Sequence, residues 1–213
     1  MSLSILLDHT SLTPPPPEGD ADSIWQPVFS TNGVGVFSDS GSDYHVVSNT
    51  PEHLLLSVYP LLNDDRRVLK DILNTRPQTD FLFSYADSHL PYPYCLLVLD
   101  KLHLTLLLKN DDFGLARFYL YDGGSRVALS NRLAPIVRGS SNIMTVNYKA
   151  LRMFGAIGWF PEYATPIEQI NQLPPGTKVG ISFENGFPMI ISFQSNPYSF
   201  LFDLVKNHEM HEL

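Results

Sequence analysis

Two short stretches hold side chains whose types and spacing suit chemistry. The segment His208-Glu209-Met210-His211-Glu212 carries two imidazoles at i and i+3, a spacing that could hold a metal ion. It lacks the His-Glu-x-x-His order of zinc hydrolases, so we favour a solvated tail. The adjacent Asp111 and Asp112 could work as a general acid and base. We favour the alternative, in which Asp111 caps a turn by accepting hydrogen bonds from backbone N–H groups.

Other reactive residue types indicate structure rather than chemistry. The single Cys95 lies in an apolar run, which predicts a small buried hydrophobe and excludes a disulfide within the chain. His103 alternates with leucines in an expected strand, where a hydrogen-bonded or surface imidazole is the better interpretation. The sequence contains no phosphate-binding loop, no G-x-G-x-x-G and no zinc ribbon, so we expect no metal and no cofactor in this chain.

The first half of the chain alternates short apolar runs with turn residues. Residues 25–29, 33–38 and 44–48 are predicted to form a meander of strands. Thr50-Pro51 is typical of a helix start, and leucine spacing predicts helices over residues 51–62 and 64–74, the second beginning with Asp64 and Asp65. Further strands are predicted at 81–85, 94–99 and 102–109, with Asp100-Lys101 as a two-residue hairpin connection.

The second half predicts two hairpins and one helix. Strands 117–121 and 126–130 flank a Gly123-Gly124 turn, and residues 147–157 can form a helix. Leu173-Pro174-Pro175-Gly176 predicts a rigid turn into strand 178–183, which a further turn joins to strand 187–193. Strands that are apolar on both faces indicate stacked layers.

Three segments are expected. Residues 1–22 form a partly flexible segment with a short strand at 2–7 and the proline run Pro14 to Pro17, which we interpret as a linker. Residues 23–195 form the domain. Residues 196–213 form a tail or linker with an apolar run at 198–205.

The composition and charge of the chain exclude several classes of protein. A hydrophobic fraction of 44% in 213 residues supports a sizeable core in one domain. A net charge of −8 without any basic cluster argues against a nucleic-acid partner. The chain has no run of 18 apolar residues and no positively charged start of a signal peptide, so we expect no membrane association and a cytoplasmic location.

A series of short motifs in the second half carries a family resemblance. Asp111, Gly114 and Tyr119 form D-x-x-G-x-x-x-x-Y, and Ala128-Leu129-Ser130, Phe160-Pro161, Thr165-Pro166, Ile170 and Leu173-Pro174-Pro175-Gly176 follow in order. This order resembles the back half of the glutaminase domain of asparagine synthetase-like proteins, the class II glutamine amidotransferases. The resemblance implies an α+β fold, a four-layer αββα sandwich with the topology of the N-terminal nucleophile (Ntn) hydrolases. It covers about a third of the chain well and the first hundred residues poorly.

The residues that perform chemistry in this family are not retained. Family members attack glutamine with an N-terminal cysteine, but Ser2 occupies that position here. The glutamine-holding Arg-Gly-Pro and Asn-Gly-Glu motifs are absent, and the nearest candidates are Arg76-Pro77 and Asn32-Gly33. Asn131 replaces a glutamate after the hairpin, and Asn110 replaces an arginine. A serine needs a dedicated base, so we expect a lost glutaminase activity and assign no catalytic residue.

The resemblance implies a partner. The family usually carries a synthetase domain that binds ATP and Mg through a Ser-Gly-Gly-x-Asp-Ser loop, which this chain lacks. The first hypothesis is a non-catalytic front domain of an amide-forming enzyme, acting as scaffold or substrate wall beside a synthetase domain or subunit. A second is a free-standing binding or regulatory module, and a third is an N-terminal-serine hydrolase. The apolar run at 198–205 predicts a homodimer of the isolated chain.

Overall fold

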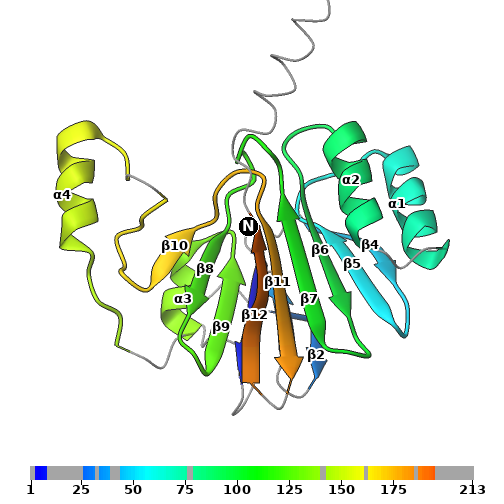
Figure 1. Ribbon diagram of the computed structural model, residues 1–213, viewed down its shortest axis with the longest axis horizontal. Helices are drawn as coiled ribbons and strands as arrows, with labels where there is room; N and C mark the ends of the chain where they lie inside the picture. Colours follow the sequence, from blue (N-terminus) through cyan, green and yellow to red (C-terminus); the bar gives the residue numbers. More distant parts are fainter. Residues whose placement is uncertain are drawn as a thin grey trace, which may run out of the picture.

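The chain has an α+β fold of two antiparallel sheets and four helices in its described part. The computed structural model describes residues 3–8, 26–31, 34–38, 44–75, 79–139, 143–160, 163–184 and 187–194. One sheet has the strand order β10-β8-β9-β1-β3-β2, and the other β12-β11-β7-β6-β5-β4. Figure 1 shows the second sheet running from β12 to β4 across the molecule.

The strands of the first sheet come from two separate parts of the described chain, residues 3–38 and 119–172. Their bounds are β1 (Leu3–Asp8), β2 (Gln26–Thr31), β3 (Val34–Ser38), β8 (Tyr119–Asp122), β9 (Arg126–Ser130) and β10 (Ile170–Gln172). β1 is an interior strand, because it pairs with β3 on one side and β9 on the other. The short strand expected at 2–7 is therefore part of the sheet, over residues 3–8.

The second sheet is built from hairpins in chain order, and β11 and β12 extend it. Its strands are β4 (His45–Asn49), β5 (His53–Ser57), β6 (Cys95–Asp100), β7 (Thr105–Asn110), β11 (Lys178–Glu184) and β12 (Phe187–Gln194). The expected meander is divided between the sheets, because β2 and β3 pair with each other whereas β4 pairs with β5.

Four helices accompany the sheets. They are α1 (Asn63–Thr75), α2 (Thr79–His89), α3 (Leu133–Gly139) and α4 (Tyr148–Ile157). Asp64 and Asp65 occupy the first turn of α1, where the helix dipole favours negative charge. The Asn147 side chain accepts a hydrogen bond from the Ala150 N–H and caps α4, which ends at Gly158 with a φ of 82°. These residues confirm the helices predicted at 64–74 and 147–157.

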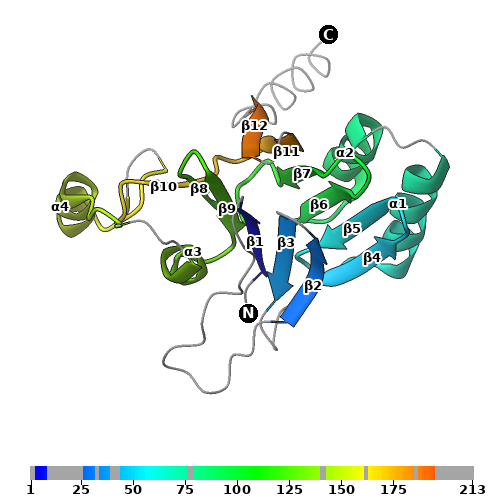
Figure 2. The same ribbon diagram turned by 90° about the horizontal axis from the view of Figure 1, so that it is seen from below.

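Three apolar clusters give the molecule its layers. The largest joins inward-facing residues of both sheets, such as Val36, Leu97, Leu129 and Ile181. A second joins α1 and α2 to the other face of the β4–β7 sheet, and a third packs α3 on β8, β9 and β3. Figure 2 shows α1 and α2 on one side of the molecule and α3 beside β9, with α4 beyond β10.

The helix predicted over residues 51–62 is wrong, because this segment contains strand β5. Leu54 and Leu56 face the core between the sheets, while Leu55 faces α1 and α2. Apolar side chains are thus buried on both faces of an extended strand, a pattern that leucine spacing alone does not separate from a helix. The Thr50 hydroxyl, expected to cap the helix, accepts instead from the His53 N–H in the turn between β4 and β5.

Two further predictions are corrected. The strand predicted at 81–85 lies within helix α2, where Leu82, Phe83 and Ala86 are buried at helical spacing. The connection between β6 and β7 has four residues rather than two, because Asp100 pairs with Thr105. The predicted strands at 94–99, 126–130, 178–183 and 187–193 are confirmed within a residue or two at their ends, and that at 117–121 is observed later, at 119–122.

Candidate functional site

Motif residues form two of the crossings between the sheets. The chain leaves β7 in one sheet and enters β8 in the other through residues 111–118, and it returns from β10 to β11 through residues 173–177. The two crossings contact each other, since the Gly176 N–H donates to the Asp111 carbonyl at 2.9 Å and the Leu173 N–H to the Phe118 carbonyl at 2.7 Å. We call this pair of segments the crossover junction.

Asp111 organises the first crossing. Its buried carboxylate accepts hydrogen bonds from three backbone N–H groups, those of Phe113 at 3.0 Å, Leu115 at 3.1 Å and Ala116 at 2.7 Å. This is the turn cap favoured by the sequence. Asp112 bonds Lys109 instead, so the two neighbouring carboxylates have different partners and do not form an acid–base pair.

The geometry of the crossover junction depends on the side chain of Asn110 and on the backbone conformations of Gly114 and Gly176. The Asn110 carboxamide donates to the Pro174 carbonyl at 2.9 Å and accepts from the Thr177 N–H at 2.6 Å, so Asn110 holds the proline turn. Gly114 has a φ of 66°, and a Cβ there would lie 2.8 Å from Pro175 Cγ. Gly176 also has a positive φ, of 64°. Both glycines therefore occupy backbone conformations that side chains disfavour.

Tyr119 and Ser130 lie beside the start of the first strand. Tyr119 pairs with Ser130 across β8 and β9, and Ser130 pairs with Ser4 across β9 and β1. Ser130 is buried, and its hydroxyl accepts from the Arg132 N–H at 3.1 Å. Ser2 lies outside the described residues. The framework residues Asp111, Gly114, Tyr119, Ser130, Pro174, Pro175 and Gly176 thus lie in the crossover junction or on the paired strands β8 and β9.

A buried lysine beside the junction was missed by the sequence reasoning. The side chain of Lys109 is 2% exposed, and its Nζ lies 2.9 Å from Asp87 Oδ1 and 3.0 Å from Asp112 Oδ1. The Tyr94 hydroxyl donates to Asp87, and burial together with this bond raises the pKa of Tyr94 far above its ordinary value. Lys109 therefore links α2 to the junction. The sole signal in the sequence is a lysine at the end of an apolar strand.

A pocket of about 440 Å³ lies between β8, β10 and the segment after α4. Its wall combines residues from all three regions and from α3, namely Arg117, Tyr119, Leu133, Phe154, Gly158, Trp159, Phe160, Ala164, Thr165, Pro166 and Gln172. Within the described residues, the Arg117 guanidinium and the Gln172 carboxamide make no hydrogen bond or ion pair. No pocket was predicted here from the sequence, although Phe160 and Thr165-Pro166 belong to the motif series.

The remaining candidates have structural surroundings or lie outside the described residues. Cys95 is a fully buried free thiol, as predicted. The strand position expected for His103 is wrong, since His103 lies in the turn before β7 with its Nδ1 2.8 Å from Asp100 Oδ2. Residues 196–213, which contain His208 and His211, lie outside the described part, as do the proline run and Arg76-Pro77.

No protein-family model matches this chain, and no curated protein sequence matches it significantly. None of the helices in the described ranges is long and apolar enough to cross a membrane.

Proposed function

We propose that this chain is a non-catalytic glutaminase-like domain of an asparagine synthetase-like, ATP-dependent amide-forming enzyme. It has the four-layer αββα arrangement of the Ntn hydrolases and serves as a scaffold or substrate wall. The observation that carries the proposal is the crossover junction. Motif residues more than 60 positions apart, Asp111 and Gly176, bond each other directly at the point where the chain changes sheets. These residues are retained because the layered fold requires them, whether or not the site is active.

The loss of chemistry rests on residue types. A serine hydroxyl is a far weaker nucleophile than a thiolate and needs an adjacent base. The two motifs that hold glutamine in the family are absent, so a nucleophile at residue 2 would lack the groups that position its substrate. Asn110, which replaces the family arginine, is fully engaged with the proline turn.

ATP and Mg belong to the partner in this proposal. The chain offers a surface for such a partner at α4, where Tyr148, Phe154 and Trp159 are 68%, 45% and 64% exposed. Ten residues of helix bury only Ala150. Large apolar side chains exposed together mark surfaces that contact another protein or domain.

The test begins with the coding sequence that follows the Leu213 codon and with the neighbouring genes. We expect a Ser-Gly-Gly-x-Asp-Ser loop in the same reading frame or in an adjacent one. The protein that contains both parts should then form its amide with ammonia or an amine substrate but not with glutamine. Equal product yield from glutamine, lost in Ser2→Ala, would contradict the proposal.

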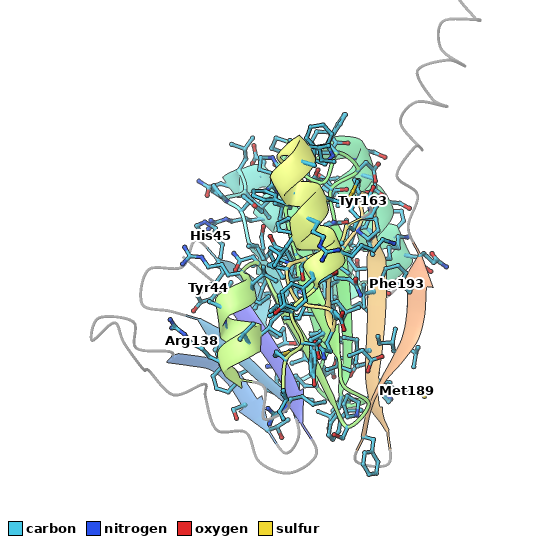
Figure 3. The ribbon with its side chains drawn as sticks, turned by 90° about the vertical axis from the view of Figure 1, so that its left-hand side faces the viewer. Tyr44, His45, Arg138, Tyr163, Met189 and Phe193 are labelled. Carbon is cyan, nitrogen blue, oxygen red and sulfur yellow. The ribbon has the colours of Figure 1, made fainter. Side chains whose placement is uncertain are left out.

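A free-standing binding module is the second candidate, and the edge strand β12 favours it. Phe187, Met189, Ile191 and Phe193 are each about half exposed on β12, which has a partner strand only in β11 within the described residues. Figure 3 shows Met189 and Phe193 on this edge of the molecule. An open apolar edge can pair with another chain, including a second copy of this one. Sedimentation of Met189→Lys beside the parent chain tests this, and a dimer only in the parent chain supports it.

A further inference from the structure

The pocket beside α4 has the composition of a binding site for a small acid. Arg117 is the one charged residue in its wall as described, and the aromatic residues Tyr119, Phe154, Trp159 and Phe160 also line it. Its volume of about 440 Å³ falls in the range of small-molecule sites. We propose that the pocket binds a monocarboxylate with an aromatic body, whose carboxylate pairs with Arg117. This inference goes beyond the proposed function, although the pocket shares Phe154 and Trp159 with the surface offered there to a partner.

Residues at and after the end of α4 form the aromatic wall of the pocket. Gly158 terminates the helix with a left-handed residue, and its N–H donates to the Phe154 carbonyl at 2.8 Å. The chain then turns so that Phe160 stacks on Phe154, with ring centroids 4.8 Å apart and planes 21° apart. Trp159 remains 64% exposed beside them. An aromatic ligand would cover rings that the fold itself leaves in contact with water, which is the main gain available to binding here.

The opposite wall is held by hydrogen bonds. The Thr165 hydroxyl donates to the carbonyls of Ile167 and Ile170 at 2.8 and 2.7 Å, so its bonding capacity is used by the fold. Gln172 pairs with Tyr119 in the β10–β8 ladder. The wall is thus anchored to the first sheet, and Arg117 and Gln172 are among the polar side chains of the described wall that could bond a ligand.

The charge of the pocket favours a carboxylate over a phosphate. A guanidinium matches a carboxylate with two parallel N–H bonds, and the Gln172 carboxamide can donate a third. The described part of the wall holds a single positive charge, and the wall residue Gly158 is the carboxyl end of α4, where the helix dipole is negative. A doubly charged phosphate would meet that negative end with insufficient compensation.

The experiment measures binding to the full chain by calorimetry. The probes are indole-3-acetate, its neutral amide indole-3-acetamide, phenyl phosphate and a short peptide ending in phenylalanine with a free carboxylate. We expect the acid to bind about tenfold more tightly than the amide or phenyl phosphate, because one charged pair is gained. The peptide distinguishes a chain terminus from a free acid as the source of the carboxylate.

Three variants locate the site. Arg117→Gln should weaken the binding of the acid about tenfold and remove the preference of the pocket for the acid over the amide. Trp159→Ala should weaken the binding of the acid and of the amide to the same extent. Arg67→Gln, which removes an exposed guanidinium of α1, should leave both unchanged and serves as the matched control. Melting curves confirm that each variant is folded.

The proposal is overturned by any of four results. These are equal affinity for the acid and the amide, undiminished acid binding in Arg117→Gln, tighter binding of phenyl phosphate, and no saturable binding of any probe up to about 10 mM.

Discussion

Asp111 shows how a residue with catalytic chemistry can be used entirely for structure. Its two oxygens accept three backbone N–H groups in a site closed to water. Asp111→Asn places an amide N–H₂ against at least one of these donors, so we expect a loss of about 2–3 kcal/mol in the free energy of unfolding, measured in urea. Asp122→Asn is the control, since Asp122 makes a single such bond, to the Gly124 N–H, in an exposed turn. Equal losses in the two variants would contradict the role of Asp111.

Cys95 offers a second check at the residue scale. Burial, and then the Asp111 carboxylate, raise the pKa of its thiol well above the ordinary value of 9.0, while Lys109 opposes them. The low thiolate fraction and the burial of the side chain should both protect Cys95 from alkylation. We expect iodoacetamide to modify Cys95 at least about a hundredfold more slowly in the native chain than in urea. Because the chain has one cysteine, intact mass reports this rate without ambiguity. Similar rates in the two conditions would show that the core between the sheets opens readily.

The junction glycine carries a prediction at the scale of elements. Gly114→Ala meets both a positive φ of 66° and a contact of 2.8 Å with Pro175 Cγ. Gly124→Ala has a φ of 76° but open space around its Cβ, and it therefore measures the backbone term alone. We expect Gly124→Ala to cost about 1 kcal/mol and Gly114→Ala clearly more, about 2–3 kcal/mol. The difference in melting temperature reports the packing of the two crossings. No difference would mean that the crossings do not support each other.

We expect the stability of the connection between β6 and β7 to depend on pH. Burial alone would raise the pKa of Asp100, but hydrogen bonds from the His103 N–H, the His103 ring and the Leu102 N–H outweigh it and lower the pKa below 3.8. A lowered pKa in the folded state stabilises the fold above the unfolded value, and this contribution is lost as the pH falls through the folded value. Asp100→Asn should therefore be less stable than the parent chain at pH 6, and the gap should narrow below about pH 4. A gap that stays constant down to pH 2 contradicts this account.

The helices, strands and turns differ in how well the sequence predicts them. Turn chemistry was predictive: Gly123-Gly124 and the Pro-Pro-Gly turn lie where the sequence indicated, because their backbone requirements are local. Apolar runs did not distinguish a strand from a helix. Residues 53–57 form a strand and residues 79–89 a helix, and the choice depends on whether one face or both faces are covered by other layers.

The candidate site divides in the same way. The turn-capping role of Asp111 was predictable, since it depends on neighbours within five residues. The bond from Asn110 to Pro174 and the partners of Lys109 depend on the meeting of distant segments. The pocket also depends on such a meeting, because its wall joins the loop before β8 to the end of α4 and to β10.

At the scale of the whole molecule, a layered core and two bonded crossings coexist with apolar side chains exposed on α4 and β12. The exposed surfaces lie at one end of each sheet, beyond β10 of the first sheet and on β12 of the second (Figure 1). This combination is what we expect of a domain whose fold is kept for contact with another protein and whose own chemistry is lost.

The most direct test of this claim is ammonia release from glutamine by the full chain. Intact mass first establishes whether Met1 has been removed, since a retained Met1 blocks any nucleophile at residue 2. The account predicts no ammonia above the buffer rate for the parent chain, for Ser2→Ala and for Ser2→Cys, because the glutamine-holding motifs are absent along with the cysteine. Sustained glutamate production by the parent chain that disappears in Ser2→Ala would contradict it.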